Sequence, residues 1–196
     1  MPKSYSEQEK EYIKKRLKEE AAKCLVRYGV RRTTVDEIVQ RVNIPKGTFY
    51  LFYKSKELLL FEVILEQHEV IVEKMYKAVS EMKQDGDMAE QLTKIVCDFF
   101  ILASKSPILK MIDSNEVEIL ARKLPPEILE KHLEYDSSAV EKVFSELPIK
   151  EGKDKDTFSA AFRAVYFATL HVEEIGEKYF EDVLYLLIKG LVNQIV

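Results

Sequence analysis

Apolar residues recur at spacings of three and four along almost the whole chain, and this spacing constrains the fold more than any other feature of the sequence. It is the spacing of one face of an α-helix, so a chain that repeats it throughout is expected to fold as packed helices. Only 6 of the 196 residues are glycine, which is too few for a turn-rich all-β protein. Because 46% of the residues are hydrophobic, the chain can bury a core. The sequence therefore predicts an all-α protein.

Helix start and stop signals divide the N-terminal part of the chain. Ser6 and Glu9 have the spacing of a capping box, and we expect the helix that follows them to end at Gly29. A second, shorter helix is expected after Thr34, and it should end at Asn43, a residue type that tolerates a left-handed turn. Two helices are thus predicted before residue 44.

A third short helix is expected over residues 45–51, and a long one over about 55–83. A helix of about 29 residues is about 43 Å long, which is enough to connect two domains. We therefore expect a three-helix domain over residues 1–54 and a helical domain over residues 55–196, with the long helix joining them.

Prolines and a charged linker divide the rest of the chain. The further helices are expected over residues 88–104, 107–123, 127–147, 157–175 and 177–196. The helix over residues 157–175 is apolar almost all the way round, so we expect it to be buried on every side. A partner subunit would make that burial easier.

The charge of the chain is distributed unevenly. Up to Lys56 there are 14 Lys and Arg against 7 Asp and Glu, a balance of +7, whereas the remaining 140 residues carry 16 against 27, a balance of −11. Such asymmetry favours a polyanion as the partner of the first segment. Basic helix faces are also often plain solvated surface, so charge alone leaves both interpretations open.

Residues 33–57 have the pattern of a helix-turn-helix: a short helix, a turn of about four residues, a second short helix, and the start of a capped long helix. The second helix of such a motif enters the major groove of DNA. Here Lys46 and Thr48 offer donors near its start, Gly47 lets the backbone approach DNA closely, and Tyr50 places a hydroxyl on the same side. Lys56 adds a cation beside free backbone N–H groups, which suits a phosphate.

At these residues the sequence resembles the TetR family of bacterial transcriptional repressors. The resemblance covers about residues 10–60 and rests on Thr34, Asp36-Glu37-Ile38, Pro45-Lys46-Gly47-Thr48-Phe49-Tyr50 and Ser55-Lys56-Glu57-Leu58. It implies an N-terminal domain that binds a palindromic DNA operator and a C-terminal domain that binds a small molecule. It also implies a homodimer formed through the last two helices.

The resemblance also implies roles for single residues. The implied phosphate contacts are Thr34, Tyr50 and Lys56. The implied base-facing residues are Lys46, Gly47, Thr48 and Leu51. Phe49 and Tyr53 are implied to be core residues that fix the second short helix.

An effector site is expected among aromatic, methionine and histidine side chains of the C-terminal domain. The candidates are His68, Met75, Phe99, Phe100, Met111, Phe144, Phe162, Tyr166 and His171. Side chains of these kinds line apolar pockets that have a few polar groups, although each one taken singly is better explained as core. The third histidine, His132, is expected to be exposed.

The sequence gives no sign of catalysis, of a cofactor or of a metal site. The residues three positions before the histidines are Leu65, Leu129 and Ala168, so the Glu-x-x-His pattern of a helical metal site is missing. Neither zinc-ligand spacing, a phosphate loop nor a nucleophile elbow is present. Two cysteines without a CxxC pair, and no signal peptide or membrane-length apolar run, lead us to expect a cytoplasmic protein.

The sequence therefore predicts a ligand-responsive DNA-binding transcriptional regulator, a repressor that a small, largely apolar molecule releases from its operator. An alternative is an all-helical, dimeric small-molecule-binding module whose helix-turn-helix is only structural. An enzyme is a third interpretation, and it would require a pocket with convergent acids and bases.

Overall fold

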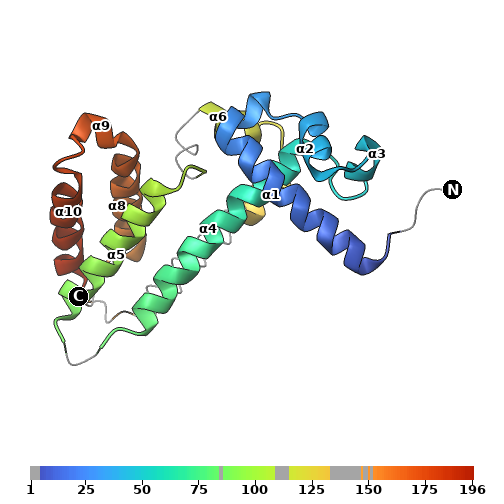
Figure 1. The fold of residues 1–196 in the computed structure, drawn as a ribbon. Helices are drawn as coiled ribbons and strands as arrows, with labels where there is room; N and C mark the ends of the chain where they lie inside the picture. The colour runs from blue at the N-terminus through green and yellow to red at the C-terminus, as the bar shows by residue number, and fades with distance from the viewer. Residues whose placement is uncertain (1–4, 84–85, 109–114, 133–146, 148–149, 151) are drawn as a thin grey trace. The chain divides into compact units, whose positions relative to one another are not determined.

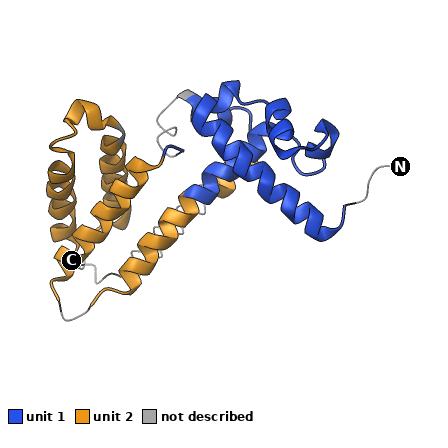
Figure 2. Cartoon of the chain, in the orientation of Figure 1, with its two compact units in different colours: residues 1–67, 107–125 blue, residues 68–106, 126–196 orange. Residues whose placement is uncertain are grey.

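The computed structural model describes residues 5–83, 86–108, 115–132, 147, 150 and 152–196, and the regular elements within these residues are helices (Figure 1). The chain forms two compact units (Figure 2). Unit 1 comprises residues 1–67 and 107–125, and unit 2 comprises residues 68–106 and 126–196. Among the described helices, none is long and apolar enough to cross a membrane.

Unit 1 is built from four helices and the first part of a fifth. These are α1 (Glu7–Arg32), α2 (Val35–Val42), α3 (Lys46–Phe49), α6 (Asn115–Ala121) and the N-terminal part of α4 (Lys56–Ser80). They enclose fully buried side chains, among them Leu17, Leu25, Ile38, Phe49, Leu59, Leu60 and Leu120. Since these come from every helix of the unit, a single core holds unit 1 together.

Helix α1 has the predicted start, and its regular part stops where predicted. The capping box is present, because Ser6 and Glu9 each accept a hydrogen bond from the other's backbone N–H. Gly29, with φ 73° and ψ 178°, interrupts the helical backbone as predicted, and a short further helical segment to Arg32 completes α1. The Gly29 carbonyl accepts bonds from the N–H of Thr33 at 3.2 Å and from its hydroxyl at 2.7 Å, which closes the final turn.

The turn between α2 and α3 is as predicted, but α3 is shorter. The Thr34 hydroxyl caps α2, and Asn43 ends it in the left-handed conformation with φ 61°. The prediction that α3 extends to Leu51 is wrong, because the chain tightens after Phe49. The N–H groups of Leu51 and Phe52 bond to carbonyls three residues back, at 3.1 and 2.9 Å. Helix α3 is therefore one helical turn long and is followed by a tight, non-helical turn.

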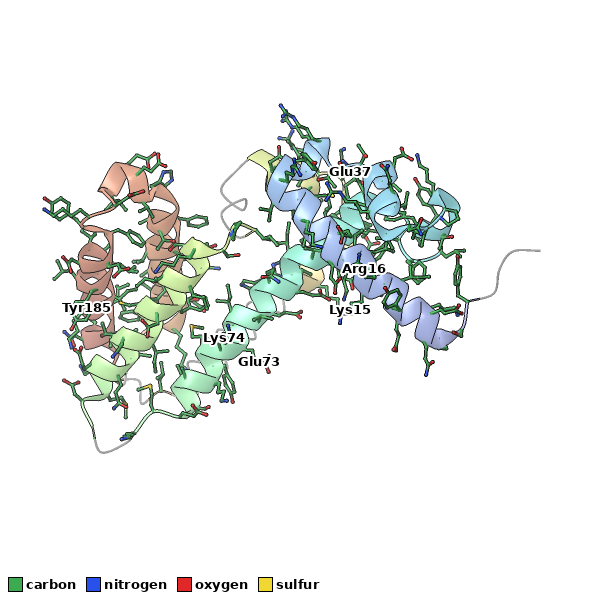
Figure 3. All side chains as sticks on the ribbon, viewed as in Figure 1. Lys15, Arg16, Glu37, Glu73, Lys74 and Tyr185 are labelled. Atoms are coloured by element: carbon green, nitrogen blue, oxygen red, sulfur yellow. The ribbon has the colours of Figure 1, made fainter. Side chains whose placement is uncertain are left out.

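Unit 2 contains the rest of α4, the helices α5 (Met88–Lys105), α8 (Lys155–Ala168), α9 (Val172–Ile175) and α10 (Phe180–Ile195), and helical residues 126–132. Its core lies where α5, α8 and α10 pack, with Val79 of α4 added. The Tyr185 hydroxyl of α10 donates to the Glu90 carboxylate of α5 at 2.9 Å (Figure 3). Helix α4 ends at Ser80, earlier than the predicted residue 83.

The predicted fully buried helix over residues 157–175 is not seen. A 3-10 segment, Thr169–His171, interrupts it between α8 and α9. Val165 is buried on α8, whereas Phe167 on the same helix is 55% exposed. In the single chain, part of this apolar surface therefore faces solvent.

Candidate DNA interface and effector cavity

Helix α3 is anchored from one side and exposes the other. Phe49 is fully buried in the core of unit 1, while Tyr50 is 52% exposed and Leu51 is 70% exposed. The rings of Phe49 and Tyr50 meet edge to face, with centroids 5.3 Å apart. Tyr53 is buried as well. Phe49 and Tyr53 thus have the core positions predicted for them, and Tyr50 and Leu51 are open to a partner.

The first turn of α3 presents a cation and a glycine. The Lys46 ammonium lies 2.9 Å from a carboxylate oxygen of Asp36 on α2, and this hydrogen bond raises the pKa of Lys46. Both side chains are exposed. A Cβ on Gly47 would have no atom within 4 Å, so the fold itself does not require glycine at this position. The open space lies outside the protein, where a close approach to DNA would use it.

Thr48 does not present its hydroxyl to solvent. The residue is only 7% exposed, and its hydroxyl is hydrogen-bonded to that of Tyr5 at 3.3 Å. A direct base contact by this hydroxyl stays a prediction, and it requires the Tyr5 phenol to move. Sequence reasoning missed Tyr5, whose signal was an aromatic residue directly before the N-cap of α1.

Lys56 has a structural partner that the sequence did not reveal. Its ammonium donates to the carbonyls of Val30 at 2.8 Å and Thr33 at 2.6 Å, so it caps the C-terminal end of α1. Desolvation lowers the pKa of Lys56. Thr34 lies beside this cap, and its exposed hydroxyl accepts the N–H of Glu37 at 3.2 Å. Phosphate contacts by Lys56 and Thr34 stay predictions.

Many of the cations in the basic segment are already paired with carboxylates of unit 1. The ion pairs are Lys10–Glu7, Lys14–Glu62, Arg16–Glu19, Lys18–Glu66, Lys23–Glu20, Arg41–Glu37 and Lys46–Asp36. Among the described residues up to Lys56, the cations without a carboxylate partner are Lys15, Arg27, Arg31, Arg32, Lys54 and Lys56. The charge available to a polyanion is therefore smaller than the balance of +7 suggests.

Helix α6 belongs to unit 1 although it lies far along the chain. The Glu116 carboxylate accepts the backbone N–H of Arg31 at 3.0 Å, and Lys123 pairs with Glu57 at 3.3 Å. These contacts join α6 to the C-terminal end of α1, and the residues just after α6 to the start of α4. The compact units are therefore divided differently from the predicted domains 1–54 and 55–196.

A cavity of about 130 Å³ lies between α4 and α5 within unit 2. Its lining is Ile71, Lys74, Met75, Ala78, Ile95, Asp98, Phe99 and Leu102. The wall is thus mainly apolar, with one cation and one carboxylate, and Figure 3 labels Lys74. Two predicted effector residues, Met75 and Phe99, lie together in this lining.

The other predicted effector residues have different positions. Phe100 is buried in the core of unit 2, and Phe162 and Tyr166 pack against that core. His171 is exposed and lies 3.6 Å from the Glu174 carboxylate. Met111 and Phe144 lie outside the described residues.

Two histidines of unit 2 lie close together. The rings of His68 and His132 meet edge to face at 5.7 Å, and His132 is half-buried rather than exposed as expected. Among the described residues, no group of three or more His, Cys, Asp or Glu could hold a metal ion. The pair belongs to the surroundings of α4 and does not by itself form a metal site.

Comparison with known proteins agrees with the geometry of the N-terminal helices. Residues 17–63 match the family model described as bacterial regulatory proteins, tetR family. These residues contain the helix-turn-helix and the start of α4. The N-terminal segment of this chain is thus similar to that family.

Relatives and solved structures extend the match beyond that segment. The HTH-type transcriptional regulator YhgD of Bacillus subtilis is 34% identical over 76 residues, which are 39% of this chain and 34% of YhgD. The fatty acid metabolism regulator protein of the same species is 23% identical over 137 residues, 68% of this chain and 69% of that protein. The structure of the regulator FadR from B. subtilis, in complex with stearoyl-CoA, has a TM-score of 0.68 at 20% identity and covers 94% of this chain and 100% of FadR. At that identity the structural match shows a shared fold.

Proposed function

We propose that this protein is a TetR-family, DNA-binding transcriptional repressor whose affinity for its operator falls when a small, largely apolar molecule binds. The observation that carries the proposal is the exposed surface of α3. Lys46, Gly47, Tyr50 and Leu51 face outward while Phe49 fixes the helix in the core. A short, rigid helix with exposed donors and a glycine suits the major groove.

We place the DNA contacts on two kinds of residue. Lys46, Gly47 and Leu51 are assigned to the base edges, together with the methyl group of Thr48, whose hydroxyl bonds to Tyr5. Thr34, Tyr50 and Lys56 are assigned to phosphates. The cations without a carboxylate partner, such as Lys54 and Arg32, add phosphate contacts around them. Phosphate contacts set position and affinity, whereas base contacts set sequence preference.

We assign the effector to the cavity between α4 and α5. Its volume of about 130 Å³ is below the roughly 300–1,000 Å³ of ordinary ligand pockets, so a sizeable ligand must part the two helices. Long-chain acyl thioesters are the first class to test, because the FadR structure contains stearoyl-CoA and the B. subtilis relative found by sequence is named as a fatty acid metabolism regulator.

The response to a ligand then follows from α4, which runs without a break from Lys56 to Ser80. Met75 and Lys74 near one end line the cavity, while Lys56 at the other end caps α1. A ligand that parts α4 from α5 shifts this helix and with it the position of α3. For this to release DNA, the ligand must bind the shifted arrangement more tightly than the DNA-bound one.

We propose a homodimer formed through α8 and α10. On α10, Leu186 is 69% exposed and Leu187 is 45% exposed, and Phe167 on α8 is exposed as well. Exposed apolar side chains on neighbouring helices are typical of an interface. Two copies of α3 must then lie about 34–36 Å apart to enter successive major grooves of a palindrome.

The remaining assignments follow from this role. Residues 1–54 are the DNA-reading domain and residues 55–196 the effector and dimerisation domain, with α4 shared between them. The protein acts on chromosomal DNA, so we place it in the cytoplasm, and no catalytic role is assigned to it.

The test is selection of bound duplexes from a randomised pool by the full-length protein, followed by addition of stearoyl-CoA to the selected complex. The proposal predicts a palindromic sequence with one half-site for each copy of α3, and release by the ligand. A protein that selects no duplex at low salt would instead be the binding module whose helix-turn-helix is only structural. Selection without release would reject stearoyl-CoA as the effector and leave the DNA-binding role standing.

A further inference from the structure

We propose that Tyr5 is a positioning residue of the recognition helix and that it acts on DNA binding through Thr48. The inference rests on the proposed function, since it assumes that α3 binds DNA. It adds a residue outside the helix-turn-helix to the set that determines how α3 is held.

Helix α3 cannot hold its orientation by itself. It has four residues, Lys46–Phe49, and its N-cap is Pro45, which makes no side-chain capping bond. A single turn of helix is unstable in water unless tertiary contacts stabilise it. Its orientation is therefore set by what its buried side chains touch.

Two buried side chains hold this turn. Phe49 is fully buried and contacts the ring of Tyr53, with centroids 6.0 Å apart. Thr48 is 7% exposed, and its hydroxyl is hydrogen-bonded to Tyr5 at 3.3 Å, across 43 positions of the chain. Thr48 and Tyr5 thus give α3 a second attachment, in addition to that of Phe49.

The position of Tyr5 is itself fixed by the start of α1. The backbone N–H and the hydroxyl of Ser6 both donate to the Glu9 carboxylate, at 2.8 and 2.9 Å. An apolar residue before such a cap ordinarily packs on the fourth residue of its own helix. Here that residue is Lys10, whose ammonium pairs with Glu7 at 2.6 Å. Tyr5 is half-buried and its hydroxyl reaches α3 instead.

The hydrogen bond between Tyr5 and Thr48 connects α3 to the capped start of α1 and so restricts the orientation of α3. Removing either hydroxyl leaves both helices folded around the core but lets α3 change its tilt. The expected consequence is a loss of both affinity and base preference, because base contacts require the helix at a fixed angle in the groove.

The experiment compares Tyr5→Phe, Thr48→Val and the double variant in the full-length protein, on the duplex that the unmodified protein selects from a randomised pool. Each single variant is expected to weaken binding about two- to tenfold, the range of one hydrogen bond. The double variant is expected to have the same affinity as the single variant that binds DNA less tightly, since the two substitutions remove the same hydrogen bond. Selection repeated with Tyr5→Phe is expected to give a broader base preference.

Tyr12→Phe is the matched control, because Tyr12 lies on the same helix and is 65% exposed. It is expected to leave affinity and base preference unchanged, and thermal unfolding measured by circular dichroism checks that every variant is folded. The inference is wrong if Tyr5→Phe binds and selects like the unmodified protein, or if the two single losses multiply in the double variant. If the unmodified protein selects no duplex, the proposed function fails and the inference fails with it.

Discussion

The two units differ in how far a single chain satisfies their side chains. In unit 1, capping residues, ion pairs and a buried Phe49 complete the structure, and the exposed apolar side chains next to α3 are Tyr50 and Leu51. Unit 2 leaves apolar side chains exposed on α10, including Leu186, and contains a mainly apolar cavity. One chain therefore satisfies unit 1 more fully than unit 2, and unit 2 is where we propose the dimer contact and the ligand.

The largest expected effect is on the stability of the unit 1 core. Phe49→Ala removes a fully buried ring and is expected to cost about 3–5 kcal/mol of unfolding free energy, together with DNA binding. Urea denaturation followed by circular dichroism measures this loss. Leu51→Ala is the control. Because Leu51 is exposed, the unfolding free energy of this variant should differ from that of the unmodified protein by about 0.5 kcal/mol or less. Equal stability of Phe49→Ala and the unmodified protein would contradict the core role of Phe49.

The incompleteness of unit 2 is tested by Leu186→Glu. A charge at this exposed apolar position is expected to weaken the dimer on the order of 30-fold (about 2 kcal/mol), because it must be desolvated in the interface. Analytical ultracentrifugation over a range of concentrations measures the dissociation constant. Tyr12→Glu, at an exposed position in unit 1, should leave the dimer intact. A monomeric unmodified protein would overturn the comparison for unit 2.

A buried carboxylate makes unit 1 sensitive to acid. Glu20 is buried, and hydrogen bonding from Lys23 lowers its pKa from the ordinary 4.5, with Arg16 adding to the effect. Its ionised form thus contributes stability that is fully present above pH 4.5 and is lost as the pH falls through the lower folded value.

Glu20→Gln removes this contribution. The variant is expected to be about 1–3 kcal/mol less stable at neutral pH, because a neutral amide loses the charge-assisted bonds of Glu20 with Lys23 and Arg16. In acid the difference should shrink, since the unmodified protein loses the same interaction. Urea denaturation at neutral pH and below pH 4.5 measures it, and Glu11→Gln, at an exposed position, is the control. A difference that does not depend on pH would rule out this role.

The smallest expected effects distinguish the roles of two nearby lysines, Lys56 and Lys54. Lys56→Met is expected to cost about 1–2 kcal/mol of stability, because the ammonium caps the carbonyls of Val30 and Thr33. Lys54 is exposed, so Lys54→Met should leave stability unchanged. It should reduce the magnitude of the slope of log affinity for DNA against log salt concentration by about one, the value for one lost phosphate contact. Salt titrations of DNA affinity alongside urea denaturation test the pair. Equal results for both variants would mean that the cap assigned to Lys56 is not a stabilising contact.

The features predicted correctly from sequence depend on neighbouring residues. The capping residues Ser6 and Thr34 and the left-handed Asn43 act within a few positions of the chain, so local patterns reveal them. The burial of Phe49 followed from the spacing of apolar residues around it together with the family resemblance. The exposed face of α3 could be expected for the same reasons.

The features missed depend on contacts between distant residues. The partners of Lys56, the bond of Tyr5 to Thr48 and the place of Glu116 beside Arg31 join positions 23 to 85 residues apart. No local pattern specifies such contacts. The aromatic residues of unit 2 show the same limit, because composition could not separate Phe99 in the cavity from Phe100 in the core.

The central claim is that unit 1 binds DNA and that a ligand in unit 2 weakens this binding. The most direct measurement is the affinity of the full-length protein for its selected duplex over a range of salt concentrations, with and without stearoyl-CoA. The account predicts an affinity that falls steeply with salt, with a logarithmic slope of about −0.9 for each phosphate contacted, and a lower affinity at every salt concentration when the ligand is present. Affinity that does not change with salt, or no binding to any duplex at low salt, would contradict it.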